Sequence, residues 1–167
     1  MKAYKFLTPD GLGTFSRFVW PLPDGGPGAW VESDVEPCRT GIHACRPIDL
    51  PYWIAPALYE IELDGPIVGH ALKVVAPRGR LIRRIEAWNP DMQAAYGQMC
   101  LARARELVAA APTSLTGWAP PPEIELTESA RLGFIAARIA EELGGTEAHA
   151  DERRRQSEWL VERLALD

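Results

Sequence analysis

The chain has 167 residues, of which 47% are apolar and 25% are charged, and its formal net charge at pH 7 is −5. This length and composition are typical of one globular domain that buries a core of its own. The acidic balance disfavours a dedicated nucleic-acid binder, and no apolar run approaches the ~20 residues of a membrane span, so neither partner is expected.

The first half of the chain, residues 1–88, has the pattern of strands separated by turns rich in glycine and proline. The segment 58–63 alternates apolar and polar residues, as in a strand with one buried face. Pro47 is well placed to start a short helix that runs to Ile54. The strands predicted in this half cover residues 1–7, 29–32, 41–45, 58–63, 67–68, 72–76 and 80–88.

The second half has a helical pattern. Asn89-Pro90-Asp91 supplies an N-cap, a first-turn proline and an acid for a first helix. A proline-rich spacer over 113–122 precedes a second helix from Thr127, which Gly144-Gly145 ends, and Thr146 starts a last helix. The apolar stripe of the first helix consists of Tyr96, Cys100, Ala104, Leu107 and Ala111.

These patterns predict an α+β fold over residues 1–167 as a single domain. We expect a mainly antiparallel sheet in residues 1–88, with the helices of residues 89–167 packed on it. The three cysteines are an odd number, which disfavours a disulfide framework, and the N-terminal apolar run is too short for a secretory signal. The expected location is therefore the cytoplasm, with free thiols.

Reactive side chains gather in the segment Cys38 to Arg46, which holds two of the three cysteines and one of the three histidines. In an extended segment, His43 and Cys45 point to the same face, about 6.6 Å apart. Three uses stay open: zinc binding by Cys38, His43 and Cys45, a Cys45 nucleophile with His43 as its base, or His43 alone as an acid–base or orienting group. The alternative is that these side chains only fill the core.

Four further residues are candidates for the same pocket. Arg17 could hold an anion, Trp20 belongs to an aromatic loop suited to a pocket rim, and Arg46 flanks Cys45. Glu60 could bind a hydroxyl group or act as an acid or base. The preferred interpretation of this alternation is a solvated strand face, or, if that face is covered, pairing of Glu60 with an arginine.

Several motifs resemble an uncharacterised family of actinobacterial and phage proteins. They are Tyr4-Lys5-Phe6, Trp20-Pro21-Leu22-Pro23, the core of Cys38 followed by Gly41-Ile42-His43-Ala44-Cys45, and Leu58-Tyr59-Glu60-Ile61-Glu62. The resemblance runs over most of the chain and is most specific in residues 1–88. It implies a fold shared with that family and no particular activity.

The order of strands, loop and short helix is also similar to the ADP-ribosyltransferase-like fold. This resemblance implies that His43 stands where that fold places its nicotinamide-stacking aromatic residue. Lys5 and Arg17 are then the nearest counterparts of its early-strand histidine or arginine. The resemblance further implies a nucleotide or NAD-like ligand and a transferase reaction.

The leading hypothesis is a small cytoplasmic enzyme whose pocket is built around His43, with a nucleotide or NAD-like molecule as ligand. His43, Cys45 and Glu60 are the candidate catalytic residues, and no bound cofactor is predicted. One alternative is a non-catalytic interaction module that uses Arg153–Arg155 beside Trp159. The other is a zinc-stabilised domain.

Overall fold

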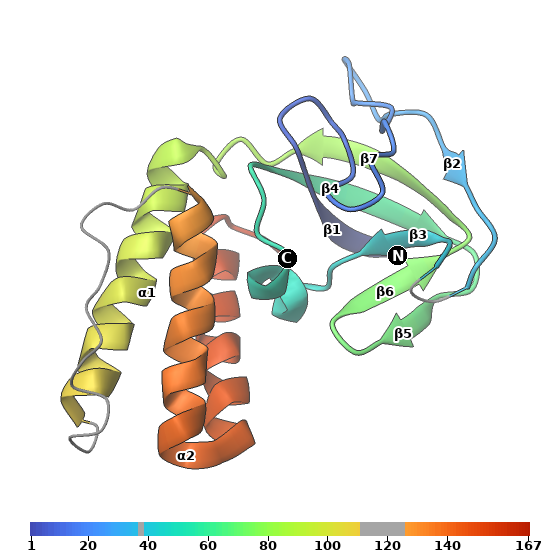
Figure 1. The fold of residues 1–167 in the computed structure, drawn as a ribbon. Helices are drawn as coiled ribbons and strands as arrows, with labels where there is room; N and C mark the ends of the chain where they lie inside the picture. The colour runs from blue at the N-terminus through green and yellow to red at the C-terminus, as the bar shows by residue number, and fades with distance from the viewer. Residues whose placement is uncertain (37–38, 111–125) are drawn as a thin grey trace. The chain divides into compact units, whose positions relative to one another are not determined.

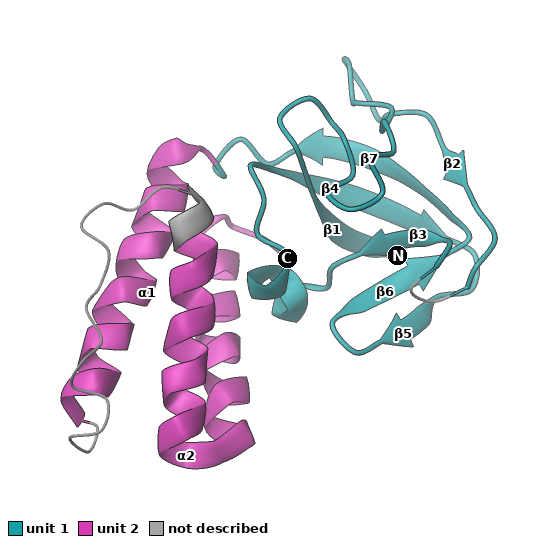
Figure 2. Ribbon diagram, viewed as in Figure 1, with its two compact units in different colours: residues 1–88, 167 teal, residues 89–166 magenta. Residues whose placement is uncertain are grey.

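A computed structural model describes residues 1–36, 39–110 and 126–167, with the side chains of residues 126–128 excepted. The chain divides into two compact units (Figure 2), which are residues 1–88 together with Asp167, and residues 89–166. The division after Trp88 coincides with the predicted change from strands to helices. That the whole chain is one domain, with its helices on the sheet, stays a prediction.

The first unit is built from antiparallel strands (Figure 1). One sheet has four strands in the order β1-β4-β7-β2, and a second has three in the order β3-β6-β5. The strands are β1 (Lys2–Leu7), β2 (Val31–Glu32), β3 (Ile42–Ala44), β4 (Ala57–Asp64), β5 (Val68–His70), β6 (Lys73–Ala76) and β7 (Arg78–Arg84).

Among the described residues, one isolated backbone bridge joins β1 to the segment that follows β3. Tyr4 in β1 and Cys45, just after β3, exchange both backbone hydrogen bonds, with N–O distances of 2.9 and 2.7 Å. On its other edge β1 pairs with β4 along its whole length. This link brings the side chain that follows Tyr4 next to β3.

The predicted alternation in β4 is confirmed, because its odd-numbered positions are buried and form the core of the unit. Tyr59, Ile61 and Leu63 pack there against side chains from the other strands. These partners include Ala3, Leu7, Ile42, Ala44, Val74 and Leu81. Sequence alternation therefore identified the buried face of the central strand.

Two predicted elements in this unit need correction. The strand expected over 80–88 ends at Arg84, because the chain turns directly after it, where the Trp88 backbone N donates a hydrogen bond to the Ile85 carbonyl at 3.0 Å. The helix expected from Pro47 to Ile54 is a 3-10 helix, η1 (Pro47–Tyr52). Its interior Pro51 has no N–H to donate to an α-helical hydrogen bond, which favours the tighter form.

The second unit consists of helices α1 (Pro90–Ala110) and α2 (Leu126–Arg163). Asn89 caps α1 as predicted, since its Oδ1 accepts a hydrogen bond from the Met92 backbone N at 3.0 Å. The predicted stripe is buried at Tyr96, Cys100, Ala104 and Leu107. Ala111 and the spacer over 113–122 lie outside the described residues.

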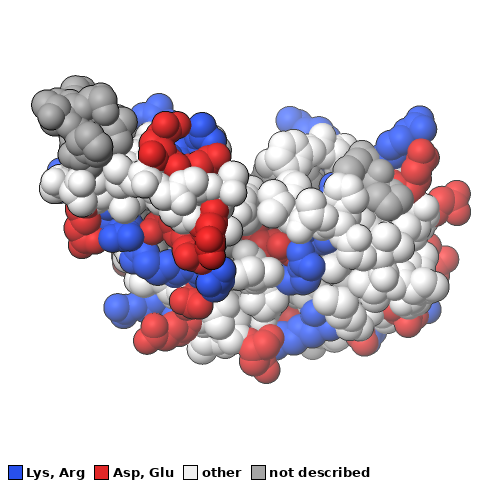
Figure 3. Space-filling model, turned by 90° about the horizontal axis from the view of Figure 1, so that it is seen from below, with Lys and Arg blue, Asp and Glu red and all other residues white. Residues whose placement is uncertain are grey.

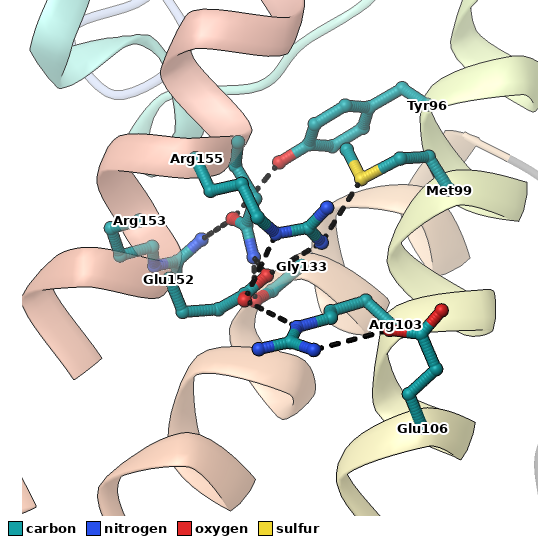
Figure 4. Close-up of polar contacts among 9 residues, drawn as sticks. Tyr96, Met99, Arg103, Glu106, Gly133, Glu152, Arg153 and Arg155 are labelled. Carbon is teal, nitrogen blue, oxygen red and sulfur yellow. Dashed lines mark hydrogen bonds and ion pairs between the residues drawn. The ribbon is translucent and has the colours of Figure 1, made fainter. Parts of the chain in front are cut away.

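Helix α2 breaks at Gly145, where the sequence predicts an end. Gly145 has φ 76° and ψ −169°, a combination that is essentially restricted to glycine. The chain reverses there, and the two halves lie side by side, as the hydrogen bond from Gln156 Nε2 to the Gly133 carbonyl at 3.0 Å shows (Figures 1 and 4). One glycine thus turns α2 into a helical hairpin.

The α+β class is confirmed, with an antiparallel sheet in the first half and helices in the second. In the part of the chain that the structure describes, no helix is both long enough and apolar enough to span a membrane.

Candidate functional site

A cavity of about 500 Å³ opens in the first unit, beside strand β3. It is lined by residues of β1, of the loop 13–16, of β3 and β6, and by Arg39, Cys45 and Trp53, which lie outside the helices and strands. The lining residues with reactive or aromatic side chains are Lys5, Phe15, His43, Cys45, Trp53 and Lys73. The structure therefore places the two predicted residues His43 and Cys45 in one cavity wall.

His43 lies in the middle of β3, opposite Val75, and its ring is half-buried. Its Nε2 is buried and has no hydrogen-bond partner among the described residues. Burial lowers the pKa of His43, and the positive charges of Lys73 and Lys5 lower it further. The imidazole is therefore neutral at pH 7 and is able to accept a proton.

Cys45 is only 5% exposed, and its surroundings do not favour a thiolate. Burial raises the pKa of the Cys45 thiol to about 12, although Lys5 acts in the opposite direction. A thiol that stays protonated at neutral pH is a poor nucleophile. The geometry therefore favours the hypothesis in which His43 acts without a Cys45 nucleophile.

Lys5 reaches the cavity from β1, on the same strand face as the buried Ala3 and Leu7. Its Nζ donates a hydrogen bond to the His43 carbonyl oxygen at 2.6 Å and lies 4.8 Å from the centroid of the Trp20 ring. Burial lowers the pKa of Lys5 to about 8; Cys45 acts in the opposite direction, and the nearby Lys73 lowers the pKa further. No described carboxylate forms an ion pair with this amine.

Lys73 is the second amine in the cavity. It begins β6, one residue beyond the Ala44–Val74 pair, and its Nζ lies 5.7 Å from the centroid of the Trp53 ring. No described carboxylate pairs with it. The chain has three lysines, and two of them line this one cavity.

Two aromatic rings form an apolar part of the wall. Phe15 and Trp53 meet edge to face, with ring centroids 5.9 Å apart. The Trp53 Nε1 donates a hydrogen bond to the Leu72 carbonyl at 2.7 Å, which holds that ring in place. Phe15 is 83% exposed and so presents a free ring face to an entering ligand.

The structure places Arg17, Trp20 and Arg46 outside the cavity lining. Arg17 is exposed in a turn with φ 57°, and Trp20 is buried against Lys5. Arg46 pairs with Asp49, with 2.7 Å between Nε and Oδ2, and caps η1. Trp20 therefore positions a lining residue, whereas Arg46 holds a helix end.

Glu60 also lies outside the cavity. Its carboxylate pairs with Arg83 at 2.9 Å and with Lys2 at 3.7 Å, and the neighbouring Glu62 pairs with Arg80 at 2.8 Å. The carboxylates of this strand face are therefore paired with arginines, while the side chains of Glu62 and Arg83 stay partly exposed. Acidic and basic side chains are similarly interspersed on the molecular face shown in Figure 3.

The zinc hypothesis receives no support from the described residues, among which no group of three or more His, Cys, Asp or Glu side chains could hold a metal ion. Cys38, one of its three proposed ligands, lies outside the described residues. A second proposed ligand, Cys45, carries a protonated thiol at neutral pH.

A separate polar network lies inside the helical unit (Figure 4). The Glu152 carboxylate is 2% exposed and accepts hydrogen bonds from Arg103 Nε at 3.0 Å, from Arg155 Nη2 at 3.1 Å and from Gln156 Nε2 at 3.1 Å. Burial alone would raise the pKa of Glu152, but hydrogen bonds from Arg155, Gln156 and Arg103 outweigh it, so the pKa is lowered. The network holds α1 and the two halves of α2 together.

The same network bears on the interaction-module hypothesis. Arg153 is 5% exposed and donates to Gln156 at 3.0 Å, and Arg155 is held by Glu152. Arg154 is exposed and pairs with Asp151 at 2.8 Å. The run Arg153–Arg155 is therefore not a continuous basic surface.

Sequence reasoning missed Trp53 and Lys73, which come from two separate segments, whereas Phe15 begins the aromatic loop that was predicted as a pocket rim. Lys5 entered only through the ADP-ribosyltransferase-like resemblance. One signal was available: Lys5 occupies an alternate position between Ala3 and Leu7, so a lysine interrupts the apolar face of the first strand.

Comparison of the chain with models of protein families, with curated proteins and with solved structures found no match.

Proposed function

We propose that the cavity binds a small anionic molecule with a planar ring, of which a nucleotide or an NAD-like molecule is the preferred class. The observation that carries this proposal is the pair of amines, Lys5 and Lys73, in a cavity wall without a described carboxylate. An anionic ligand would supply the counter-charge that the wall lacks.

Desolvation makes a positive charge on Lys5 unfavourable. Lys5 is removed from water far enough to lower its pKa to about 8, so its positive charge is unfavourable in the free protein. A phosphate or carboxylate 4 Å from an ammonium group is attracted by about 4 kcal/mol at an effective dielectric constant of 20. Binding an anion therefore removes a penalty that the empty cavity carries.

The shape and the rings support the planar part of the ligand. A volume of about 500 Å³ falls within the usual range of small-molecule sites. Phe15 and Trp53 provide ring faces that an adenine or nicotinamide ring could stack against. Lys73, beside the Trp53 ring, would then meet the anionic group.

His43 is the proposed acid–base residue of this site. Its neutral imidazole could accept a proton from a hydroxyl group or water molecule, which is the usual part that histidine plays in transfer reactions. A transferase reaction on a nucleotide or NAD-like ligand is the proposed activity. If the protein binds without turnover, the same cavity serves as a non-catalytic binding site.

The test is calorimetric titration with NAD⁺, AMP, adenosine and inorganic phosphate. We expect AMP or NAD⁺ to bind, adenosine to bind more weakly, and Lys73→Met to weaken binding of the anionic ligands by about tenfold. Lys2→Met is the matched control, because Lys2 pairs with Glu60 and Asp167 outside the cavity. Absence of binding by every nucleotide at millimolar concentration would overturn the proposal.

Turnover is tested separately, by release of nicotinamide from NAD⁺. His43→Ala should abolish turnover while leaving Tm nearly unchanged, because His43 is only half-buried. A loss of several degrees in Tm together with unchanged turnover would mean that His43 is only a packing residue.

A further inference from the structure

We infer that Lys5 is a nucleophilic amine that forms an imine with an aldehyde or ketone group of a ligand bound in this cavity. The inference rests on the proposed function only in that a small anionic molecule enters the cavity. It adds a covalent step and a carbonyl-containing ligand class.

The first support is the way the amine is held. Lys5 Nζ is fixed by the hydrogen bond of 2.6 Å to the His43 carbonyl oxygen and by the Trp20 ring beneath it. A neutral amine that donates one hydrogen there keeps its lone pair free. The lone pair is then available at a fixed point in the wall of an open cavity.

The second support is the absence of a described carboxylate partner together with the presence of a second cation. Lysine amines become nucleophiles where they are desolvated or lie next to another cationic group. Lys5 meets both conditions, because it is half-buried, with a pKa lowered by desolvation, and Lys73 lines the same cavity. With a pKa of about 8, about a quarter of Lys5 is neutral at pH 7.5, against about one part in a thousand for an ordinary lysine.

The chain carries its own comparison in Lys2, three positions earlier on β1. Lys2 forms ion pairs with Asp167 and Glu60. The hydrogen bond with Asp167 raises the pKa of Lys2, so its amine stays protonated. Of these two lysines on one strand, Lys2 thus has a raised pKa and Lys5 a lowered pKa.

The proposed step balances without an oxidant or reductant. The Lys5 nitrogen attacks the carbonyl carbon, a C–N bond forms, and the carbonyl oxygen becomes the hydroxyl group of a carbinolamine. That hydroxyl group takes a proton and leaves as water, which gives the imine. The neutral imidazole of His43 lines the same cavity and is suited to carry the proton from nitrogen to oxygen.

The ligand class follows from the rest of the wall. Lys73 would hold an anionic group, and Phe15 with Trp53 would hold a ring or apolar part. We therefore expect a carbonyl compound that carries a phosphate or carboxylate. Pyridoxal 5′-phosphate combines an aldehyde, a planar ring and a phosphate, so it is a suitable probe.

The experiment treats the full chain with substoichiometric pyridoxal 5′-phosphate at pH 7.5, reduces the imine with borohydride and maps the labelled peptides. We expect Lys5 to be labelled at least about tenfold faster than Lys2, and Lys73→Met to slow labelling of Lys5 by about tenfold. Pyridoxal without the phosphate should label Lys5 more slowly. Labelling that is equal at Lys2 and Lys5, or that goes to the α-amine of Met1 instead, would overturn the inference.

The comparison of Lys5 with Lys2 uses the wild-type chain, so its outcome does not depend on whether a substituted protein folds. Lys5→Arg, which keeps the positive charge, should in addition remove the imine absorbance, and Lys2→Met should not. Addition of AMP or NAD⁺ separates this inference from the proposed function. Labelling of Lys5 that nucleotides do not slow would support the imine and overturn nucleotide binding, whereas nucleotide binding without labelling of Lys5 would do the reverse.

Discussion

Lys5 Nζ donates a hydrogen bond to the carbonyl oxygen of His43, 2.6 Å away, and so ties the first strand to the strand that carries the candidate site. The bond supplies a polar partner but no counter-charge. The amine consequently lies in a position where the neutral form is favoured, and the pKa of Lys5 is lowered to about 8.

The first prediction concerns the pH dependence of stability. Lys5 has a pKa of about 8 in the folded state and 10.5 in the unfolded state. Above pH 8 the folded chain has mostly lost this proton while the unfolded chain still holds it, so the unfolded chain binds more protons. The free energy of unfolding contributed by Lys5 therefore rises as the pH increases from 7 to 9. Between pH 7 and pH 9, the free energy of unfolding of Lys5→Met should fall by about 1 kcal/mol relative to that of the wild type, as measured by urea denaturation at pH 7, 8 and 9.

Lys2→Met is the control for this measurement, since the pKa of Lys2 is raised and both its states stay protonated up to pH 9. Titration of Cys45, which is present in both proteins, cancels in the comparison. An equal pH dependence in wild type and Lys5→Met would show that Lys5 is solvated like an ordinary lysine.

The second prediction concerns thiol reactivity. Burial raises the pKa of both Cys45 and Cys100 to about 12, which leaves about a thousandfold less thiolate at pH 7.5 than an exposed cysteine has. Alkylation by iodoacetamide, followed residue by residue with mass spectrometry, should be at least about a hundredfold slower in the native protein than in guanidinium chloride. Rapid native alkylation of Cys45 would restore the nucleophile hypothesis.

The third prediction concerns the buried carboxylate of the helical unit. Glu152→Gln removes the charge that Arg103 and Arg155 are oriented around, and we expect it to lower the free energy of unfolding by about 3 kcal/mol. Glu106→Gln, which removes a 66% exposed partner of the same Arg103, should cost less than about 1 kcal/mol. Equal effects of the two substitutions in urea denaturation would mean that burial of Glu152 is unimportant.

The stability difference between wild type and Glu152→Gln depends on pH in a defined direction. Because the pKa of Glu152 is lowered in the folded state, its contribution is present above the unfolded value of 4.5 and is lost as the pH falls through the folded value. The stability difference between wild type and Glu152→Gln should therefore shrink below pH 4.5.

The fourth prediction concerns the break in α2. A methyl group at Gly145 would meet no atom within 4 Å, so the cost of Gly145→Ala comes from its φ of 76° alone. We expect a loss of about 1–3 kcal/mol in thermal unfolding, and Gly145→Asn should not recover it, because ψ −169° lies outside the left-handed helical region that asparagine tolerates. Gly26→Ala, which also meets no atom and has no positive φ, should change stability by less than about 0.5 kcal/mol. A neutral Gly145→Ala would show that the helical hairpin does not depend on this glycine.

The elements of this protein follow from local patterns. Alternation identified the buried face of β4, Asn89 marked the start of α1, and Gly144-Gly145 marked the reversal in α2. Each of these signals depends on neighbours within a few residues, which the order of amino acids contains directly.

Local sequence patterns predicted only part of the candidate site. His43 and Cys45 share a segment, and they do line one cavity. Arg46 was chosen because it flanks Cys45 in sequence, and Arg17 because it belongs to an aromatic loop; the structure places Arg46 at a helix end and Arg17 in an exposed turn. Nearness along the chain was a poor guide, because a pocket is assembled from segments far apart.

The sequence by itself determined the α+β class, the change from strands to helices after Trp88 and the presence of His43 in an extended segment. Only the tertiary structure decided that Lys5 and Lys73 line one cavity with His43. The antiparallel register of β3 with β6 brings Lys73 there, and the Tyr4–Cys45 bridge brings Lys5. Register and bridging depend on pairing between distant strands, and the lowered pKa of an amine depends on what surrounds it, so neither can be seen in the order of residues alone.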